Sequence, residues 1–274
     1  MFDVPTSLSP SRVQSFTKCP LAFRFASIQN LPDPGSVSTL KGTIVHRVLE
    51  LLFGLEPAQR TNEAAQALLP QAWSESIVSD DFLRLRLDDV QSEAMRSECS
   101  VLIDQYFEIE TPSTIEPVGT ELRIAAQLGQ LELRGIIDRL DRAPDGTLVI
   151  TDYKTGKAPP QSQEQERFAA MHFYAWLCEE TLGERPSEMR LLYVPSRRVL
   201  SSAPTQQTIS FLPRRTSAVF AAIEKACTTG VFRTQKGSLC NYCSFKRWCP
   251  EFGGDPDRAA DEAPVVYAVP GRPA

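Results

Sequence analysis

The stretch that decides the fold is "ITDYKTGKAP", residues 150–159, where an aspartate and a lysine stand two positions apart at the end of an apolar run. Side chains alternate between the faces of a β-strand, so Asp152 and Lys154 share one face and Tyr153 takes the other. The run before them is rich in β-branched residues, which favours a strand. The sequence therefore predicts a strand that ends with a carboxylate beside an ammonium group.

A second acidic strand end lies just upstream. "RGIIDRLD" carries Asp138, and the turn signal "PDG" connects it to the strand of Asp152. A tight turn pairs such strands antiparallel, so the two aspartates should lie side by side. Magnesium or manganese could relieve their repulsion, because these ions take carboxylate oxygens and tolerate an imidazole, which His46 could supply. Lys154 could then offset charge on a phosphoryl group under attack. The alternative is an ion pair on an exposed strand end, without catalysis.

Helical and strand patterns alternate along the rest of the chain, which indicates an α/β fold. Apolar spacing and capping signals predict helices over 9–18, 38–54, 61–78, 82–108, 163–183 and 214–230. Alternating or β-branched runs predict strands over 118–128, 130–143, 147–154, 189–196 and 205–211.

Composition narrows the class of protein. Hydrophobic residues make up 42% of the 274, no run approaches the roughly 20 apolar residues of a membrane span, and the first residues lack a signal-peptide pattern. We therefore expect a cytoplasmic protein with no membrane partner. The net charge is -5, but residues 190–250 hold ten basic residues against one acid. That surplus is either a solvated face or a track that binds phosphates. The candidate phosphate contacts are Arg197, Arg198, Arg214, Arg215, Lys246 and Arg247.

The chain has seven cysteines, an odd number that argues against a disulfide framework in the cytosol. Cys99, Cys178 and Cys227 stand singly in helical patterns, so they should be buried apolar residues. The other four cysteines are grouped differently: "CNYCSFKRWC" supplies Cys240, Cys243 and Cys249, and Cys19 stands alone near the start. Thiolates this close together need a shared soft cation, which could be zinc or an iron-sulfur cluster. The split spacing is unusual for a zinc ribbon.

Three motifs in this order resemble the PD-(D/E)XK nuclease superfamily, within it the RecB-type exonuclease branch that includes CRISPR-associated RecB-like nucleases. They are "GTIVHRVLE" with His46, "GIID" with Asp138 and "DYKTGK" with Asp152 and Lys154. The resemblance implies a restriction-endonuclease-like core, in which a mixed central sheet is flanked by helices. It also implies that His46, the two aspartates and the carbonyl of Tyr153 bind the metal, while Lys154 positions and activates water.

Two further features of that branch can be compared. Tyr174 stands where a Gln-x-x-x-Tyr motif has its tyrosine and would contact substrate or order the site, but Ala170 occupies the glutamine position. The cysteine layout resembles the [4Fe-4S] clasp of RecB-like and AddB-type nucleases. The resemblance implies that Cys19 and residues 237–250 hold such a cluster, with zinc as the alternative.

We therefore expect one nuclease domain over residues 1–253, with a helical insertion at about 55–110 and a disordered tail over 254–274. The predicted activity is Mg²⁺- or Mn²⁺-dependent hydrolysis of DNA, as an exonuclease on single-stranded ends in DNA repair, recombination or related DNA processing. A helicase or another DNA-processing protein is a possible partner. The alternatives are a DNA-binding or assembly module with a weakened site, and a zinc-clasped protein with no nucleic-acid role.

Overall fold

The computed structural model describes residues 1–269, and these divide into two compact units. The central unit comprises Gly35–Ala125 and Gly135–Ile209. The terminal unit comprises Met1–Pro34, Ala126–Arg134 and the chain from Ser210 onward. Among the described residues, no helix combines the length and apolar character that crossing a membrane requires.

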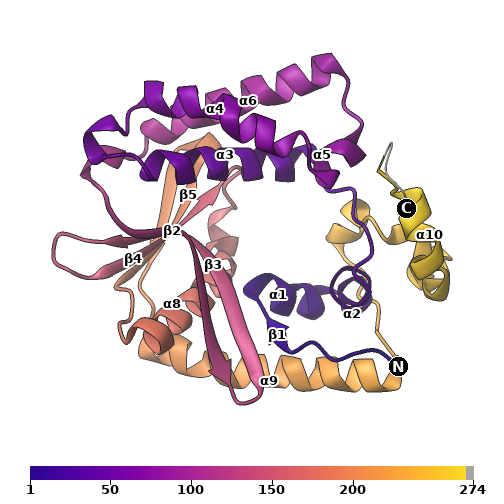
Figure 1. The fold of residues 1–274 in the computed structure, drawn as a ribbon. Helices are drawn as coiled ribbons and strands as arrows, with labels where there is room; N and C mark the ends of the chain where they lie inside the picture. The colour runs from indigo at the N-terminus through magenta and orange to yellow at the C-terminus, as the bar shows by residue number, and fades with distance from the viewer. Residues whose placement is uncertain (270–274) are drawn as a thin grey trace. The chain divides into compact units, whose positions relative to one another are not determined.

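The central unit is built on a mixed β-sheet (Figure 1), as the sequence predicts. Its strands are β2 (Glu116–Leu128) and β3 (Leu131–Arg142), of which residues 126–134 belong to the terminal unit, with β4 (Leu148–Lys154), β5 (Glu188–Tyr193) and β6 (Arg198–Ser202). β2 pairs with β3, β3 with β4 antiparallel, β4 with β5 parallel, and β5 with β6 antiparallel. The predicted tight turn joins β3 to β4, where the Ala143 N–H donates to the Thr147 carbonyl at 2.8 Å.

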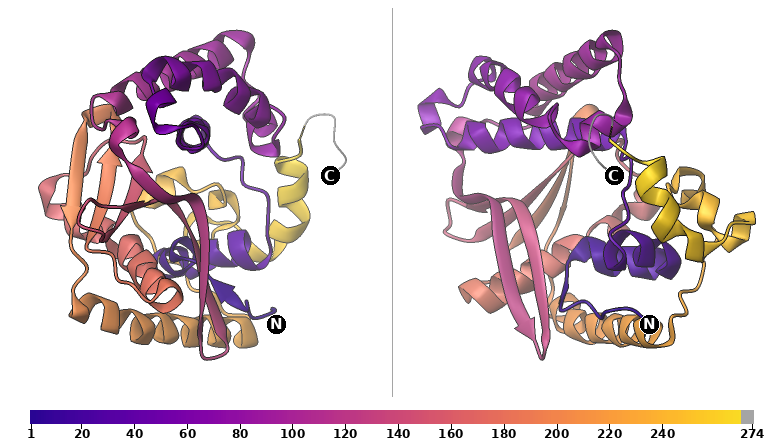
Figure 2. Two further views of the ribbon diagram at one scale, coloured as in Figure 1. Left: turned by 60° about the vertical axis from the view of Figure 1, so that its left-hand side comes forward. Right: turned by 45° about the vertical axis from the view of Figure 1, so that its right-hand side comes forward.

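One face of this sheet is covered by a layer of helices, which Figure 2 shows from two further sides. The layer contains α3 (Val37–Phe53), α4 (Asn62–Ser76), α5 (Asp80–Leu85) and α6 (Asp89–Phe107), with the short turns η2 (Pro57–Gln59) and η3 (Pro112–Thr114). Its core packs Ile44, Val48 and Ile103 together with Tyr153 and Leu192 of the sheet. The segment predicted as a helical insertion thus forms α4, α5 and α6.

The predicted continuous helix over 82–108 is wrong, because two helices occupy this stretch. Arg86 ends α5 in the left-handed region with φ 51°, and Asp88 starts α6. The Asp88 side chain accepts from the Gln91 N–H, and the Gln91 side chain accepts from the Asp88 N–H. This reciprocal cap satisfies backbone donors at the new helix start, which makes the break favourable.

The opposite face of the sheet is contacted by α8 (Ala169–Leu182), which packs against β4. The turn η4 (Gln161–Gln163) and the short helix α7 (Glu164–Arg167) precede it. Gly183 ends α8 with φ 70°, a conformation that glycine adopts without steric cost. The single helix predicted over 163–183 is therefore divided near Phe168.

The strand predicted over 205–211 is also wrong, because α9 (Gln206–Thr229) begins there. Thr205 accepts from the Thr208 N–H through its hydroxyl, and the Thr208 hydroxyl accepts from the Thr205 N–H. Such a cap starts a helix even where threonine and isoleucine favour a strand. The partner strand of β5 lies earlier, at β6, and the turn η5 (Val194–Ser196) connects the two.

The terminal unit is mostly helical. β1 (Ser7–Leu8) pairs parallel with the start of β3, and α1 (Pro10–Lys18), α2 (Pro20–Phe23) and the π-helix η1 (Arg24–Ile28) follow. Ser9 caps α1, as predicted. Four short 3₁₀ turns come after α9 and precede the helix α10 (Ala259–Val266). These turns are η6 (Ser238–Tyr242), η7 (Lys246–Trp248), η8 (Pro250–Phe252) and η9 (Pro256–Arg258).

The expected disordered tail is not seen over residues 254–269, where η9 and α10 form instead. Ala259 and Ala263 are fully buried, one helical turn apart. The indole N–H of Trp248 donates to Glu262 at 2.8 Å. The content of acids, glycine and proline in this segment suggested disorder, but these two alanines give the helix a narrow apolar face that is buried. Residues 270–274 of the predicted tail lie outside the described residues.

Candidate active site

Asp138 and Asp152 lie on neighbouring strands of the central unit, as the hairpin predicts. β3 and β4 pair with Arg139 opposite Thr151, which sets the two aspartates side by side. The Tyr153 N–H donates to Asp138 Oδ2 at 2.8 Å. Burial and the neighbouring charge of Asp152 raise the pKa of Asp138 to about 8. Two carboxylates are thus held together where only a proton or a cation can relieve their repulsion.

His46 reaches the same place from α3. Its Nδ1 lies 3.5 Å from Asp138 Oδ2, and its Nε2 lies 3.1 Å from the carbonyl oxygen of Tyr153. Burial lowers the pKa of His46, although the charges of Asp152 and Glu121 oppose that shift. A neutral imidazole is the form that binds a metal.

Glu121 completes the group, although the sequence patterns did not indicate it. Ligand atoms of His46, Glu121 and Asp138 all lie within 4.8 Å of one another. Glu121 sits on β2 with φ 45°, a strained conformation for a residue with a Cβ. Burial and the Asp138 charge raise its pKa. The sequence offered only an acid inside a β-rich run, a placement that strands disfavour.

Lys154 forms an ion pair with Asp152 on the face that Tyr153 does not share. Burial opposes the charge of Lys154, but the charges of Asp152 and Asp138 hold its pKa above the usual value. Asp152 is 9% exposed, and its Oδ2 is buried against the Lys154 ammonium. The pair that the opening motif predicts is therefore present, and it lies beside the acidic group.

Tyr174 approaches the site from α8. A Cβ on Gly135 would lie 2.5 Å from Tyr174 Cε1, so the tyrosine ring packs directly on the backbone of β3. Burial, together with the charges of Asp152, Asp138 and Glu121, raises the pKa of Tyr174, which keeps its hydroxyl protonated. Ala170, four residues earlier on α8, carries no polar group that could reach the acids.

The donor set fits a hard divalent cation. Mg²⁺ and Mn²⁺ prefer carboxylate and carbonyl oxygens, and an imidazole can join them. Carboxylates, an imidazole and a backbone carbonyl lie together here, and the acids are close enough for their charges to raise the pKa of Asp138. His46, Glu121 and Asp138, with Asp152 and Tyr153, are the residues that could hold such an ion.

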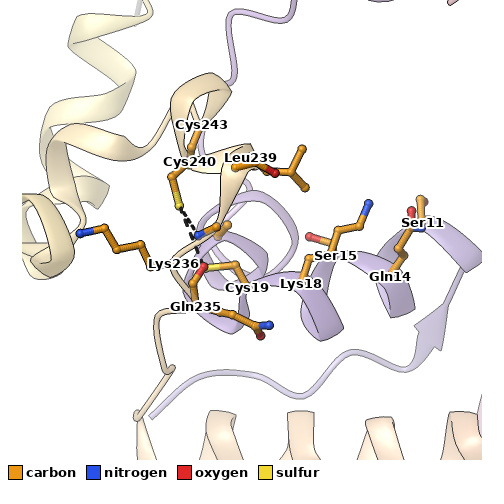
Figure 3. A pocket seen from close by; sticks show the side chains of 13 residues that line it. Ser11, Gln14, Ser15, Lys18, Cys19, Gln235, Lys236, Leu239, Cys240 and Cys243 are labelled. Atoms are coloured by element: carbon orange, nitrogen blue, oxygen red, sulfur yellow. Dashed lines mark hydrogen bonds between the residues drawn. The ribbon is translucent and has the colours of Figure 1, made fainter. Parts of the chain in front are cut away.

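The terminal unit holds a second group, the cysteine cluster, which we define as Cys19, Cys240, Cys243 and Cys249. Figure 3 shows the first three around one cavity of about 480 Å³. Burial raises the pKa of Cys243, and the sulfurs of Cys19, Cys240 and Cys249 raise it further. The four thiols are therefore neighbours, and all four are free. Cys99, Cys178 and Cys227 are fully buried, as predicted for apolar packing.

Backbone N–H groups point at the cluster sulfurs. The Gly237 N–H donates to Cys240 Sγ at 3.4 Å, and the backbone at Phe245 and Glu251 bonds the sulfurs of Cys243 and Cys249. Such bonds stabilise thiolates and are typical of metal-thiolate centres. Within residues 1–269, three ligand atoms lie within 4.8 Å of one another at His46, Glu121 and Asp138, and no three of the cluster sulfurs lie that close together.

The structure divides the predicted phosphate contacts between the two units. Arg197 pairs with Glu108 at 2.5 Å, and Arg198 with Glu164 at 2.8 Å, both in the central unit. The others lie in the terminal unit. Arg214 and Arg215 are exposed on α9, Arg247 is exposed, and Lys246 lies over the ring of Phe252 at 4.6 Å.

With this geometry in place, comparisons with known proteins identify the family. A family model described as the PD-(D/E)XK nuclease superfamily matches residues 7–250. The chain therefore belongs to the PD-(D/E)XK nuclease superfamily, and nuclease chemistry is the activity that this membership implies.

More specific relatives are distant. Proteins described as one subunit of an ATP-dependent helicase/deoxyribonuclease, from Streptococcus agalactiae serotypes Ia, V and III, are each 24% identical over 160 residues. The match covers 56% of this chain but 14% of each relative, so the chain corresponds to a small part of their length. A solved structure described as "Crystal structure of SSO0001" is 15% identical; the match covers 92% of this chain and 89% of that chain, with a TM-score of 0.38.

Proposed function

We propose that the chain is a Mg²⁺- or Mn²⁺-dependent deoxyribonuclease. One observation carries the proposal: His46, Glu121 and Asp138 converge beside the Asp152–Lys154 ion pair at the end of β4. Family membership supports nuclease chemistry, and the name of the streptococcal relatives supports DNA as the substrate.

The residues would divide the work as follows. His46, Glu121 and Asp138, joined by Asp152 and the Tyr153 carbonyl, would hold the ion. When bound, the ion would polarise a phosphoryl oxygen and make water easier to deprotonate. Tyr153 orients two of these ligands, because its N–H holds the Asp138 carboxylate and its carbonyl meets the His46 ring.

Lys154 would stabilise negative charge and position water. Its raised pKa keeps it an ammonium at neutral pH, which suits the stabilisation of a phosphoryl group more than proton abstraction. Tyr174 keeps its proton as well, so its hydroxyl can donate a hydrogen bond to a phosphate oxygen.

We place single-stranded DNA ends first among substrates. The exposed basic residues Arg214, Arg215 and Arg247 can contact phosphates without reading sequence. Tyr242 is 87% exposed and could stack on an unpaired base. Phe245 and Trp248 are buried and pack instead in the terminal unit.

The decisive experiment is cleavage of end-labelled single- and double-stranded DNA with Mg²⁺ or Mn²⁺. Lys154→Ala should lower the cleavage rate by about 10²- to 10³-fold, the usual loss for a group that stabilises transition-state charge. Lys157→Ala is the matched control, an exposed lysine three residues further along. Equal cleavage by wild type and Lys154→Ala would contradict the proposal. Product lengths separate exonuclease from endonuclease action.

A second candidate is a DNA-binding or assembly module with a weakened site. Ala170 favours it, because the position that carries glutamine in the RecB-type pattern has no polar side chain here. DNA binding without cleavage under either metal would select this function.

For the cysteine cluster we propose a [4Fe-4S] centre that joins Cys19 to Cys240, Cys243 and Cys249. One cysteine near the start of the chain and three near the end form a split layout that is unusual for a zinc ribbon, so it favours the cluster over zinc. Protein purified without oxygen should be brown and contain iron and acid-labile sulfide, and one zinc per colourless chain would contradict this.

We further propose a helicase as a partner in DNA repair or recombination. The support is the name of the streptococcal relatives, which includes a helicase, together with the small share of their length that this chain matches. The test is co-purification from the source cells with wild type and with Lys154→Ala as baits. A helicase should be recovered with both, because the interaction does not require cleavage; recovery with neither would contradict the proposal.

A further inference from the structure

Arg139 lies on β3 directly after Asp138, on the opposite face of the strand, and it is fully buried. Its guanidinium donates to Asp141 at 2.7 Å and forms two bonds to Glu110, each at 2.8 Å. It also lies 4.5 Å from the centre of the Phe53 ring. A buried arginine is tolerated only with such partners, because an unpaired charge in the interior costs several kcal/mol.

The same guanidinium is connected to the proposed metal site by a hydrogen bond to Tyr153. Arg139 Nη1 donates to the Tyr153 hydroxyl at 2.6 Å, which ties one end of the tyrosine to the buried network. At its other end, the Tyr153 N–H holds Asp138 and its carbonyl meets His46 Nε2. The Tyr153 ring also packs edge-on against the His46 ring at 5.6 Å. One residue thus joins the buried arginine to two predicted ligands.

We propose that Arg139 is a positioning residue for the metal site and acts through the Tyr153 hydroxyl. The inference rests on the proposed metal site, and it assigns a role to a residue that would touch neither ion nor DNA. The hydrogen bond from Arg139 holds the Tyr153 hydroxyl in place. This would restrain the backbone of Tyr153, whose N–H and carbonyl then keep Asp138 and His46 at ligand spacing. Groups that orient ligands in this way typically change metal affinity by about 10- to 100-fold when they are removed.

The network contains its own control. The Tyr106 hydroxyl accepts from the same Arg139 Nη1 at 3.2 Å and donates to Glu110 at 2.9 Å. Both tyrosines are buried, and both rings pack against each other. Neither hydrogen-bond partner of the Tyr106 hydroxyl is a predicted metal ligand, so this hydroxyl should serve the buried network alone.

The test compares Tyr153→Phe with Tyr106→Phe by Mn²⁺ binding without DNA, from the loss of the electron paramagnetic resonance signal of free Mn²⁺. Each variant removes one hydroxyl from Arg139 and should cost a similar amount of folding stability. Tyr153→Phe should bind Mn²⁺ about tenfold more weakly, and Tyr106→Phe should match wild type. Equal affinity in wild type and Tyr153→Phe, or equal loss in both variants, would overturn the inference.

Arg139→Lys provides the second measurement. A lysine keeps a positive charge between Glu110 and Asp141 but cannot reproduce the forked contacts, so Mn²⁺ affinity should fall as in Tyr153→Phe. Circular dichroism verifies that the variants are folded, and if Tyr153→Phe is not, Arg139→Lys decides alone. Wild type that binds no Mn²⁺ would refute the proposed metal site, whereas wild-type binding with unchanged variants would refute only the role of Arg139.

Discussion

The acidic site of the central unit and the cysteine cluster of the terminal unit solve the same problem in different ways. Each gathers side chains that could bind a metal from distant parts of the sequence. Asp138 and Asp152 are fixed by a strand ladder, and a buried network lies behind them. Cys240, Cys243 and Cys249 lie instead in or beside short 3₁₀ turns. The difference indicates that the acidic site is organised by the fold, whereas the cysteine segment would depend more on the metal centre proposed for it.

The largest effect should follow from breaking the cysteine cluster. Cys243→Ser should abolish the proposed cluster and expose residues 235–255 to protease, because metal binding at structural thiolate sites contributes on the order of 10 kcal/mol to folding. Limited proteolysis and visible absorbance measure this. Cys227→Ala, a buried cysteine outside the cluster, should keep the colour. A coloured, protease-resistant Cys243→Ser would show that the segment is as preorganised as the acidic site.

Metal should stabilise the acidic site without creating it. Mn²⁺ at 100 times its dissociation constant should add about 2.7 kcal/mol to the free energy of unfolding, seen as a higher Tm. Glu121→Gln should lose most of this gain, since it removes one carboxylate from the group of three ligands. Glu116→Gln, an exposed acid on the same strand, should keep it. An equal stabilisation of both variants by Mn²⁺ would show that Glu121 is not a ligand.

A change at Gly135 tests how tightly the acidic site is packed. The Cβ of Gly135→Ala would lie 2.5 Å from Tyr174, so the ring must move, at a cost of about 1–3 kcal/mol in urea unfolding. The cleavage rate should fall with it. Gly156→Ala is the control, because its added Cβ meets no atom within 4 Å. Unchanged stability in Gly135→Ala would mean that Tyr174 moves freely.

The smallest effects should come from the basic residues. Arg214→Ala, on the exposed face of α9, should weaken DNA binding and reduce the slope of affinity against salt by about one, as expected for one lost phosphate contact. Arg197→Ala should do less, because Glu108 already pairs with this side chain. Fluorescence anisotropy across a salt series measures both. A larger effect for Arg197→Ala than for Arg214→Ala would indicate that DNA contacts the central unit at Arg197.

Much of the acidic site could be predicted from local patterns. The tight turn between β3 and β4 sets Asp138 beside Asp152, because the register of a short hairpin follows from its turn. The same alternation sets Lys154 on the face of Asp152. Local patterns placed His46 only on a helix, and the family resemblance implied its role as a ligand; its approach to Asp138 required the packing of α3 against the sheet.

The roles of Glu121 and Arg139 could not be predicted, because each depends on structure that the neighbouring residues do not determine. Glu121 itself adopts a left-handed backbone conformation within β2, and no residue propensity indicates this. Arg139 reads as a surface residue on a strand, but its charge is met by Glu110, which lies 29 residues earlier. The start of α9 was missed because a cap at Thr205 outweighed the strand preference of the residues after it.

The sequence by itself determined the hairpin, the acid-lysine face and the grouping of Cys240, Cys243 and Cys249, since each depends on residues a few positions apart. Only the tertiary structure added Glu121 to His46 and Asp138, and only it brought Cys19 beside the other three cysteines, as the resemblance had implied. These contacts join segments far apart in the chain, and their geometry is set by buried packing and strand register, which local sequence preferences do not encode.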